Sequence, residues 1–375
     1  MEEKIYIKPP PQQASTSTLK DPAGKGEGDD NIGERPYKRL YQTWKGGNIF
    51  VFGGRFIFGP SVISLYLTLF LLITPVVLFS LFIPQKLSLE FGHKSSIVIT
   101  AVAAFFTKFD LFLLLMTSSR DPGIVPRNTE PLESEENSNG IVFPVAKDVI
   151  VNGIVVKVKY CHTCMLYRPP RCSHCSVCDN CVERFDHHCP WVGQCIGKEF
   201  RFFFLFVAST TLLCIYVFIF SLINLCKTME VNKSNIWHAI LESPIASLLI
   251  VYTFIGTWFV GGLSIFHLYL IYTNQTTYEN FRYRYEKKRN PYNRGFFRNI
   301  NEIFFSRIPE SKNHFRAKVL RPDPITEKTS TACSTTSTAV DLEISGGKRK
   351  AVSESEMDEV KFHFDSLRGS MDNTT

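Results

Sequence analysis

Four long blocks of apolar residues alternate with polar segments along the chain. Residues 61–83 and 202–225 contain no charged side chain, and residues 96–118 and 245–272 form two further blocks. A helix needs roughly 20 mostly apolar residues to cross the hydrocarbon core of a bilayer. The pattern therefore predicts four transmembrane helices at these positions, and four crossings leave both termini on the same side of the membrane.

The polar segments between and beyond these blocks differ in character. Residues 1–35 and 321–375 are rich in serine, threonine and charge, so we expect both tails to be disordered. Residues 273–320 mix aromatic and basic side chains and are expected to lie along the membrane surface. The longest internal polar segment, 119–201, joins the second apolar block to the third.

Basic residues near the ends of the blocks indicate the orientation, because cytosolic connections carry an excess of Lys and Arg. The connectors 84–95 and 226–244 hold four: Lys86, Lys94, Lys227 and Lys233. The opposite side holds twelve within about 20 residues of the blocks: Lys45, Arg55, Arg120, Arg127, Arg184, Lys198, Arg201, Arg282, Arg284, Lys287, Lys288 and Arg289. We therefore predict that both termini and segment 119–201 are cytosolic. The net charge of +7 then fits anionic lipid headgroups better than nucleic acid.

A short alternating stretch inside segment 119–201 predicts a β-hairpin. Residues 148–160 alternate apolar and polar side chains on either side of Asn152-Gly153. An Asn-Gly pair between β-branched runs is a strong signal for a tight hairpin turn. Such a hairpin would deliver the chain to Cys161.

Cysteine and histidine residues crowd the region that follows. Eight of the eleven cysteines fall between Cys161 and Cys195, together with four histidines. Disulfide frameworks do not need histidine, whereas zinc sites often use it, and a two-residue gap lets two cysteines bind one tetrahedral ion. Two structural zinc ions need eight ligands, and the block offers twelve candidates. The spacing does not say which four are left over. Reduced, metal-bound thiols agree with a cytosolic location.

The run Asp186-His187-His188-Cys189 carries the strongest chemical signal. A cysteine becomes a nucleophile when a nearby histidine takes its proton, and a carboxylate can orient that histidine and support its charge. Pro190 restricts Cys189 to extended backbone conformations. The run therefore has the acid, base and thiol of a nucleophilic site, provided that the backbone brings them together.

Two other functions remain open at this point. A zinc-stabilised adaptor or RING-type ligase anchored by four helices would use Cys189 and His187 as zinc ligands or bystanders. A metal transporter would need ligands facing one another inside several spans, and only His267 and Asp110 are available there. Metal content separates the adaptor from the enzyme, because only the adaptor is expected to lose zinc on Cys189→Ala.

Residues 37–320 resemble the DHHC protein S-acyltransferases, also called palmitoyltransferases. The matching motifs are Arg-Pro-Pro-Arg-Cys-Ser-His-Cys at 168–175 and Asp-His-His-Cys-Pro-Trp-Val at 186–192. Asp-Pro-Gly at 121–123 and Thr-Thr-Tyr-Glu at 276–279 match the family's two other short motifs in the expected places. The segments Val-Lys-Tyr-Cys and Met-Leu-Tyr-Arg-Pro-Pro are most similar to the plant members and their fungal Ras-acylating relatives.

The resemblance implies a role for most of the block. One structural zinc would be held by Cys161, Cys164, His174 and Cys181, and a second by Cys175, Cys178, His188 and Cys195. Asp186 would orient His187, His187 would act as base, Cys189 would carry the acyl group, and Thr277 would hydrogen-bond near Asp186. His162 and Cys172 are left without a role, Asp121 and Glu279 are treated as structural, and Asn299 matches a C-terminal aromatic motif loosely.

The expected fold is an all-α membrane protein whose four transmembrane helices carry a cytosolic zinc-binding cysteine-rich domain of short β-hairpins, at about 159–201, between helices 2 and 3. The implied reaction moves a long-chain acyl group, typically palmitoyl, from acyl-CoA to cysteines of membrane-associated substrate proteins. Membrane lipids are the other expected partner, nucleic acid is not one, and the resemblance leaves room for an accessory subunit. The expected location is the endomembrane system or the plasma membrane, with the active site facing the cytosol.

Some polar residues inside the apolar blocks keep two interpretations each. Lys108 and Asp110 would be costly against lipid, so they either line a substrate path or face other helices and the interface. His267 either contacts the acyl-CoA headgroup or is a packed histidine. The phenylalanines of 200–206 fit an acyl groove or a lipid-facing surface equally.

Overall fold

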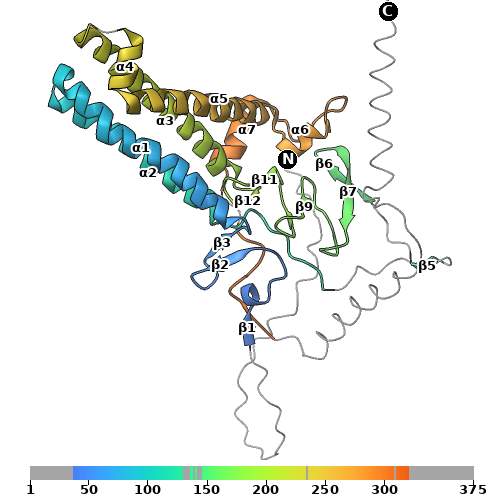
Figure 1. The fold of residues 1–375 in the computed structure, drawn as a ribbon. Helices are drawn as coiled ribbons and strands as arrows, with labels where there is room; N and C mark the ends of the chain where they lie inside the picture. Colours follow the sequence, from blue (N-terminus) through green and yellow to red (C-terminus); the bar gives the residue numbers. More distant parts are fainter. Residues whose placement is uncertain are drawn as a thin grey trace, which may run out of the picture. The chain divides into compact units, whose positions relative to one another are not determined.

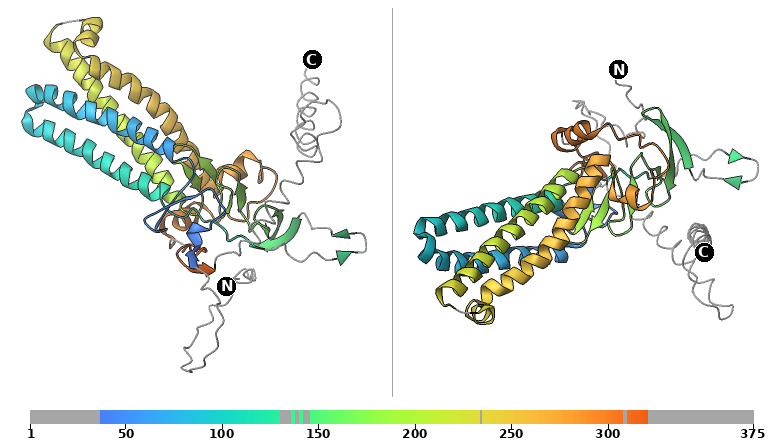
Figure 2. Two further views of the ribbon diagram at one scale, coloured as in Figure 1. Left: turned by 60° about the horizontal axis from the view of Figure 1, so that its bottom comes forward. Right: turned by 90° about the horizontal axis from the view of Figure 1, so that it is seen from above.

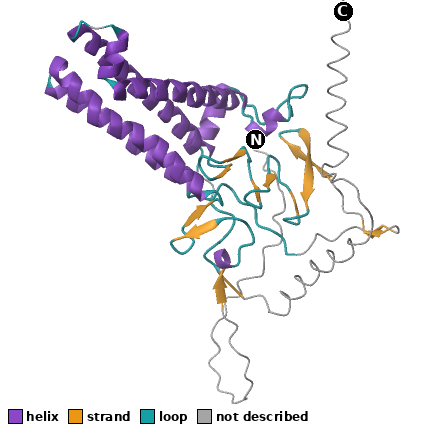
Figure 3. Cartoon of the chain, viewed as in Figure 1, coloured by secondary structure: helices purple, strands orange, loops and turns teal. Residues whose placement is uncertain are grey.

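The computed structural model describes residues 37–129, 136–137, 140–141, 146–233, 235–307 and 310–320. The two tails predicted to be disordered, 1–35 and 321–375, lie outside these described residues. Within the described part, long helices and short β-hairpins are sharply separated (Figures 1 and 3).

Four long helices correspond to the four apolar blocks. They are α1 (Val62–Phe91), α2 (His93–Ser118), α3 (Phe200–Val231) and α5 (Pro244–Thr273). Each is long and apolar enough to cross a membrane, as the hydropathy pattern predicts. The chain is therefore a multi-pass membrane protein with four candidate spans. Figure 2 shows the four helices running side by side.

The largest departure of a helix end from its apolar block is at the end of α1, and α3 also continues past its block to Val231. Pro84, which ends the first uncharged block, lies inside α1, as does Pro75. Proline is tolerated in membrane helices because neighbouring helices and local adjustments satisfy the freed backbone groups. Helix α1 therefore continues to Phe91, where Gly92 separates it from α2.

The helices pack around α3, which contacts α1, α2 and α5. Large apolar side chains of all four helices form one buried cluster. Polar contacts also join the helices: the hydroxyl groups of Thr211 in α3 and Ser264 in α5 are hydrogen-bonded at 2.9 Å. Asp110 is fully buried in α2 and accepts a hydrogen bond from Ser209 of α3, whereas Lys108 is exposed. Asp110 thus faces a neighbouring helix.

Shorter elements complete the fold. At the far end of the bundle α4 (Ile236–Glu242) joins α3 to α5, and its cap Asn235 accepts from the His238 amide. Beyond α5 come α6 (Thr277–Phe281), α7 (Phe296–Ile300) and a π-helical turn (Asn301–Phe305). A 3₁₀ turn (Leu40–Gln42) follows β1 (Tyr37–Arg39), which pairs with β13 (Lys318–Leu320).

The remaining strands form antiparallel hairpins. Two of these pairs lie outside the cysteine-rich segment: β2 (Ile49–Val51) with β3 (Phe56–Phe58), and β4 (Glu136–Asn137) with β5 (Gly140–Ile141). The predicted Asn152-Gly153 hairpin is confirmed, because β6 (Ala146–Val151) pairs with β7 (Ile154–Cys161). Strand β7 also pairs with β8 (Leu166–Tyr167). Two further hairpins follow: β9 (Ser173–Cys175) with β10 (Asn180–Val182), and β11 (His187–Cys189) with β12 (Gln194–Ile196).

One buried glutamine attaches the last hairpin to the helices. The side-chain nitrogen of Gln194 lies within hydrogen-bond distance of three carbonyl oxygens, those of Ile57 at 3.0 Å, Ser118 at 3.1 Å and Arg120 at 2.7 Å, which share its two N–H groups. Two of these carbonyls lie at the end of α2. In addition, the Thr68 hydroxyl of α1 donates to the Trp191 carbonyl at 2.6 Å. The β11–β12 hairpin is therefore held against the ends of two membrane helices.

The turn of this hairpin requires glycine for two reasons. Gly193 has φ +73, and a β-carbon there would lie 2.6 Å from the Ser61 carbonyl oxygen. Gly153 has a similar φ of +77, but a β-carbon there would meet nothing within 4 Å. Gly193 therefore meets both a conformational and a steric requirement for glycine, whereas Gly153 meets only the conformational one.

We expect Gly193→Ala to destabilise the protein more than Gly153→Ala. Both changes place a β-carbon at positive φ, which costs about 1–2 kcal/mol, but only the first also collides with the backbone before α1. Thermal unfolding of the detergent-purified variants measures the difference. Equal losses for the two variants would contradict the close packing of the turn against Ser61.

Candidate active site and metal centres

Two clusters of cysteine and histidine side chains lie in the hairpin region. The first brings Cys161, Cys164, His174 and Cys181 together, and the second Cys175, Cys178, His188 and Cys195; within each, the ligand atoms all lie within 4.8 Å of one another. In the first cluster Nδ1 of the histidine is 3.5–3.8 Å from the three sulfurs, and in the second 3.3–3.8 Å. A tetrahedral zinc with ordinary bond lengths would separate sulfur and nitrogen by about 3.6 Å. Both clusters therefore fit a closed zinc site.

The pleat of the strands explains how neighbouring residues reach different clusters. Successive side chains of a strand point to opposite faces. In β9, His174 belongs to the first cluster and Cys175 to the second. His174 lies directly opposite Cys181 on β10, its partner in the first cluster. Asp179 also lies 3.5 Å from the other nitrogen of His174, a carboxylate contact typical of metal-binding histidines.

The same alternation separates the second cluster from the other side chains of β11. His188 lies opposite Cys195 of β12, and both belong to the second cluster. His187 and Cys189, on either side of His188, point to the opposite face of the strand. Neither His187 nor Cys189 belongs to a Cys/His cluster. The spacing of the cysteines and histidines left open which of them lie in a cluster. The register of β11 and β12 places His188 in one and leaves His187 and Cys189 outside.

The other face of β11 carries a hydrogen-bonded acid and base. Asp186 Oδ2 lies 2.7 Å from His187 Nδ1. An ionised carboxylate only accepts hydrogen bonds, so Nδ1 carries a proton, and Nε2 is a proton acceptor whenever the ring is neutral. Thr277 donates to Asp186 twice, from its hydroxyl at 2.7 Å and from its amide at 2.9 Å. Cys189 is only 5% exposed and packs in the apolar cluster of the membrane helices.

The charges of this pair stabilise each other. Burial alone would raise the pKa of Asp186, but hydrogen bonds from His187 and Thr277, together with the nearby His267 ring, lower it well below its usual range. Burial alone would lower the pKa of His187, yet its bonds to Asp186 and Cys189 raise it to about 9. Asp186 therefore stays ionised, and it favours a positive charge on His187.

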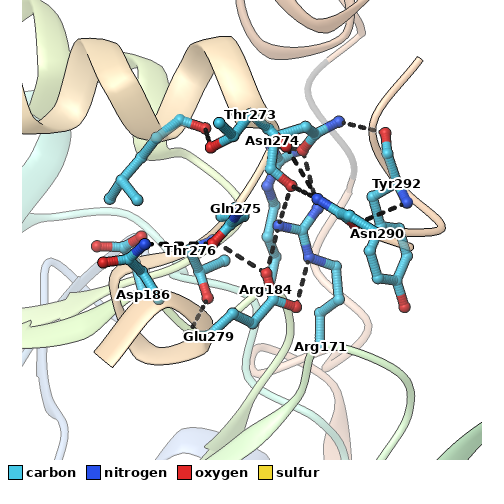
Figure 4. A network of polar contacts seen from close by, with 12 residues as sticks. Arg171, Arg184, Asp186, Thr273, Asn274, Gln275, Thr276, Glu279, Asn290 and Tyr292 are labelled. Atoms are coloured by element: carbon cyan, nitrogen blue, oxygen red, sulfur yellow. Dashed lines mark hydrogen bonds and ion pairs between the residues drawn. The ribbon is translucent and has the colours of Figure 1, made fainter. Parts of the chain in front are cut away.

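A buried polar network fixes the segment that carries Thr277 (Figure 4). Thr276 and Glu279 form a capping box at the start of α6, with bonds of 3.1 and 3.0 Å. The Glu279 carboxylate also accepts two hydrogen bonds from the Arg171 guanidinium, from Nη2 at 2.8 Å and from Nε at 3.1 Å. The Arg171 side chain also bonds Asn274 and lies over the Tyr292 ring at 4.3 Å. Arg171 thereby joins the cysteine-rich hairpins to the end of α5.

Several of these contacts were not assigned a role from the sequence. Arg171 stands inside the matched motif at 168–175, but its partner Glu279 lies 108 residues away. No sequence pattern indicated a role for Gln194. For His267 the sequence left two interpretations open, a contact with acyl-CoA or a packed histidine. Asn299, by contrast, is fully buried and donates to the Tyr272 carbonyl at 2.8 Å, which accounts for an asparagine in the loosely matched C-terminal motif.

Two residues left without a role take no part in the clusters. Cys172 packs beside the first cluster without joining it. His162 is exposed and contacts the Tyr160 ring. Of the phenylalanine stripe, Phe200, Phe203 and Phe206 are buried.

A thiol packed among membrane helices, beside an ion-paired histidine, suits an enzyme that handles a group carried in lipid. Four candidate membrane spans and this buried thiol fit a membrane-bound acyltransferase. The family model DHHC palmitoyltransferase matches residues 155–284. Probable protein S-acyltransferase 7 of Arabidopsis thaliana is 54% identical over 86% of this chain and 71% of its own length. Probable protein S-acyltransferase 6 and protein S-acyltransferase 8 of the same plant are 57% and 52% identical, each over 76% of this chain and over 72% and 74% of their own lengths. The chain belongs to the DHHC palmitoyltransferase family.

We expect Glu279→Ala to destabilise the folded protein by about 3–5 kcal/mol, because it leaves the buried Arg171 charge without its partner. Glu230→Ala is the matched control. Its carboxylate pairs with Lys227 at 2.6 Å on an exposed helix end, so about 1 kcal/mol or less is expected. Thermal unfolding of both purified variants checks the order. A Glu230 variant as unstable as the Glu279 variant would be inconsistent with this network.

Proposed function

We propose that the chain transfers a long-chain acyl group from acyl-CoA to protein cysteines through an acyl-Cys189 intermediate. The observation that supports this most is the position of Cys189: it shares a strand face with His187, outside both metal clusters, and packs in the apolar core of the membrane helices. The family relationship supports the same reaction.

In the first step His187 Nε2 accepts the Cys189 thiol proton. The thiolate attacks the thioester carbonyl carbon, the bond from that carbon to the CoA sulfur breaks, and the proton returns to the departing thiolate. The hydrogen bond from Nδ1 to Asp186 holds the imidazole in the tautomer that this step needs. Asp186 itself stays ionised and supports the imidazolium.

In the second step a cysteine of the substrate protein takes the place of CoA. His187 accepts the proton of the substrate thiol, and the substrate sulfur attacks the acyl-Cys189 carbonyl. The bond from that carbon to the Cys189 sulfur breaks, and His187 returns the proton to Cys189, which leaves as a thiol. Only the carbonyl has to reach the polar side of the boundary, while the acyl chain stays in hydrocarbon. That arrangement saves roughly 0.8 kcal/mol per buried CH₂.

The metal role proposed here is structural. Zinc held by each Cys/His set would have four protein ligands and no open position for substrate. Its contribution is to fix the hairpins, and through His188 to fix the strand that carries His187 and Cys189. Thr277 supports catalysis indirectly, because it holds the carboxylate that orients the base.

We also propose that the hairpin region and both termini face the cytosol, in a membrane of the endomembrane system or the plasma membrane. The excess of basic residues on that side supports this orientation. The protein substrates are then membrane-associated proteins with cytosolic cysteines.

We expect Cys189→Ser to abolish the acyl-enzyme while both zinc ions stay bound. Incubation of the purified protein with a clickable palmitoyl-CoA, followed by hydroxylamine cleavage, measures the intermediate, and elemental analysis measures zinc. Cys226→Ser, at the opposite end of α3, is the control that should keep the intermediate. A Cys189→Ser protein with parental transfer rates, or with less than two zinc ions, would refute the proposed role.

Chemical labelling of Cys226 tests the proposed membrane orientation. This cysteine is exposed at the end of the bundle away from the hairpins. In sealed microsomes a membrane-impermeant maleimide should label Cys226 only after the vesicles are opened, because that end of α3 is luminal. Comparison with Cys226→Ser assigns the label. Labelling of Cys226 in intact vesicles would reverse the orientation.

A further inference from the structure

A second histidine lies beside the proposed catalytic pair, on a different element. His267 belongs to α5, ten residues before Thr277, and is 1% exposed. Aromatic rings enclose it: Phe203 at 5.1 Å, Phe266 at 5.4 Å and Phe200 at 5.6 Å between ring centres. A polar ring this deeply buried among apolar ones is costly unless both nitrogens find partners.

One nitrogen of His267 has a clear partner, and it fixes the character of the other. Nδ1 lies 2.8 Å from the Leu263 carbonyl oxygen, which only accepts, so Nδ1 carries a proton. Nε2 is buried, makes no hydrogen bond to any described residue, and lies 3.8 Å from Asp186 Oδ2. The Asp186 carboxylate is thus the charged group that Nε2 faces.

Asp186 is therefore approached from three elements. His187 reaches it from the β11 strand, Thr277 from the start of α6, and His267 from inside the membrane helix α5. His187 and Thr277 are partly exposed, whereas His267 is buried among phenylalanine rings, where water cannot replace it.

We propose that His267 is a positioning residue, which fixes the Asp186 carboxylate from the membrane side and so keeps the His187 ring aimed at Cys189. This inference rests on the proposed roles of these three residues in acyl transfer. It assigns His267 no contact with CoA or with the acyl group. Its loss should therefore slow the chemical step and leave acyl-CoA binding unchanged.

Two variants separate positioning from packing. His267→Phe keeps a ring among the neighbouring rings but removes both nitrogens. His267→Gln keeps an amide N–H close to the place of Nε2. In full-length protein purified in nanodiscs, kcat and KM for palmitoyl-CoA are measured, together with the zinc content. His238→Phe changes an exposed histidine of α4 and is the control that should leave the rate unchanged.

We expect His267→Phe to lower kcat by about 10- to 100-fold, the range that small misplacements of catalytic groups produce, with KM and two zinc ions unchanged. His267→Gln should recover most of that loss. A parental kcat in His267→Phe would overturn the inference, and so would a Gln variant as slow as the Phe variant.

Asp186, His187 and His267 could also form a metal site, because their ligand atoms lie within 4.8 Å of one another. A third zinc ion in the parent that disappears in His267→Phe would overturn the positioning role in favour of metal binding. Cys189→Ser, measured in parallel, separates the two proposals. If it retains activity, the proposed reaction fails; if it is inactive while His267→Phe is fully active, only the role of His267 fails.

Discussion

The burial of one carboxylate is the constraint on which the rest of the site depends. Asp186 is 3% exposed, and an ionised carboxylate removed from water is stable only when several donors surround it. Its donors come from the neighbouring His187 and from Thr277, which follows α5. The hairpins therefore cannot move away from the end of α5 without leaving that charge unpaired. The interactions that stabilise the docked hairpins are the same ones that orient the base.

Two further attachments leave the hairpin region little freedom. Arg171 and Glu279 form a bidentate pair between the hairpins and α6, and Gln194 donates to carbonyls at the end of α2. Gln194 fixes the β11–β12 hairpin itself, and Arg171 fixes the segment that leads into β9. Cys189 can therefore stand inside the apolar cluster of the helices while its neighbour His188 belongs to a metal cluster. A precise site at a membrane boundary needs such rigid supports, because lipid itself supplies no directional contacts.

The sequence predicted the four apolar helices and the Asn152-Gly153 hairpin, since both depend on local patterns of hydrophobicity and turn residues. It did not predict that α1 continues through Pro84, because a proline within a membrane helix is satisfied by neighbours that the local sequence does not reveal. The division of cysteines and histidines between two clusters followed only from the family resemblance. Spacing left it open because strand register, not the gap length, sends His174 and Cys175 to different clusters.

The contacts that escaped prediction share one physical property. The pairs joining Arg171 to Glu279 and Gln194 to Ser118 connect residues 108 and 76 positions apart. No periodicity within a single helix or strand carries such information. Each of these partners is polar and buried at the edge of an apolar region, where an unpaired group is most costly. Polar residues next to apolar blocks are therefore the positions where a membrane enzyme of this kind concentrates its long-range contacts, and His267 belongs to the same class.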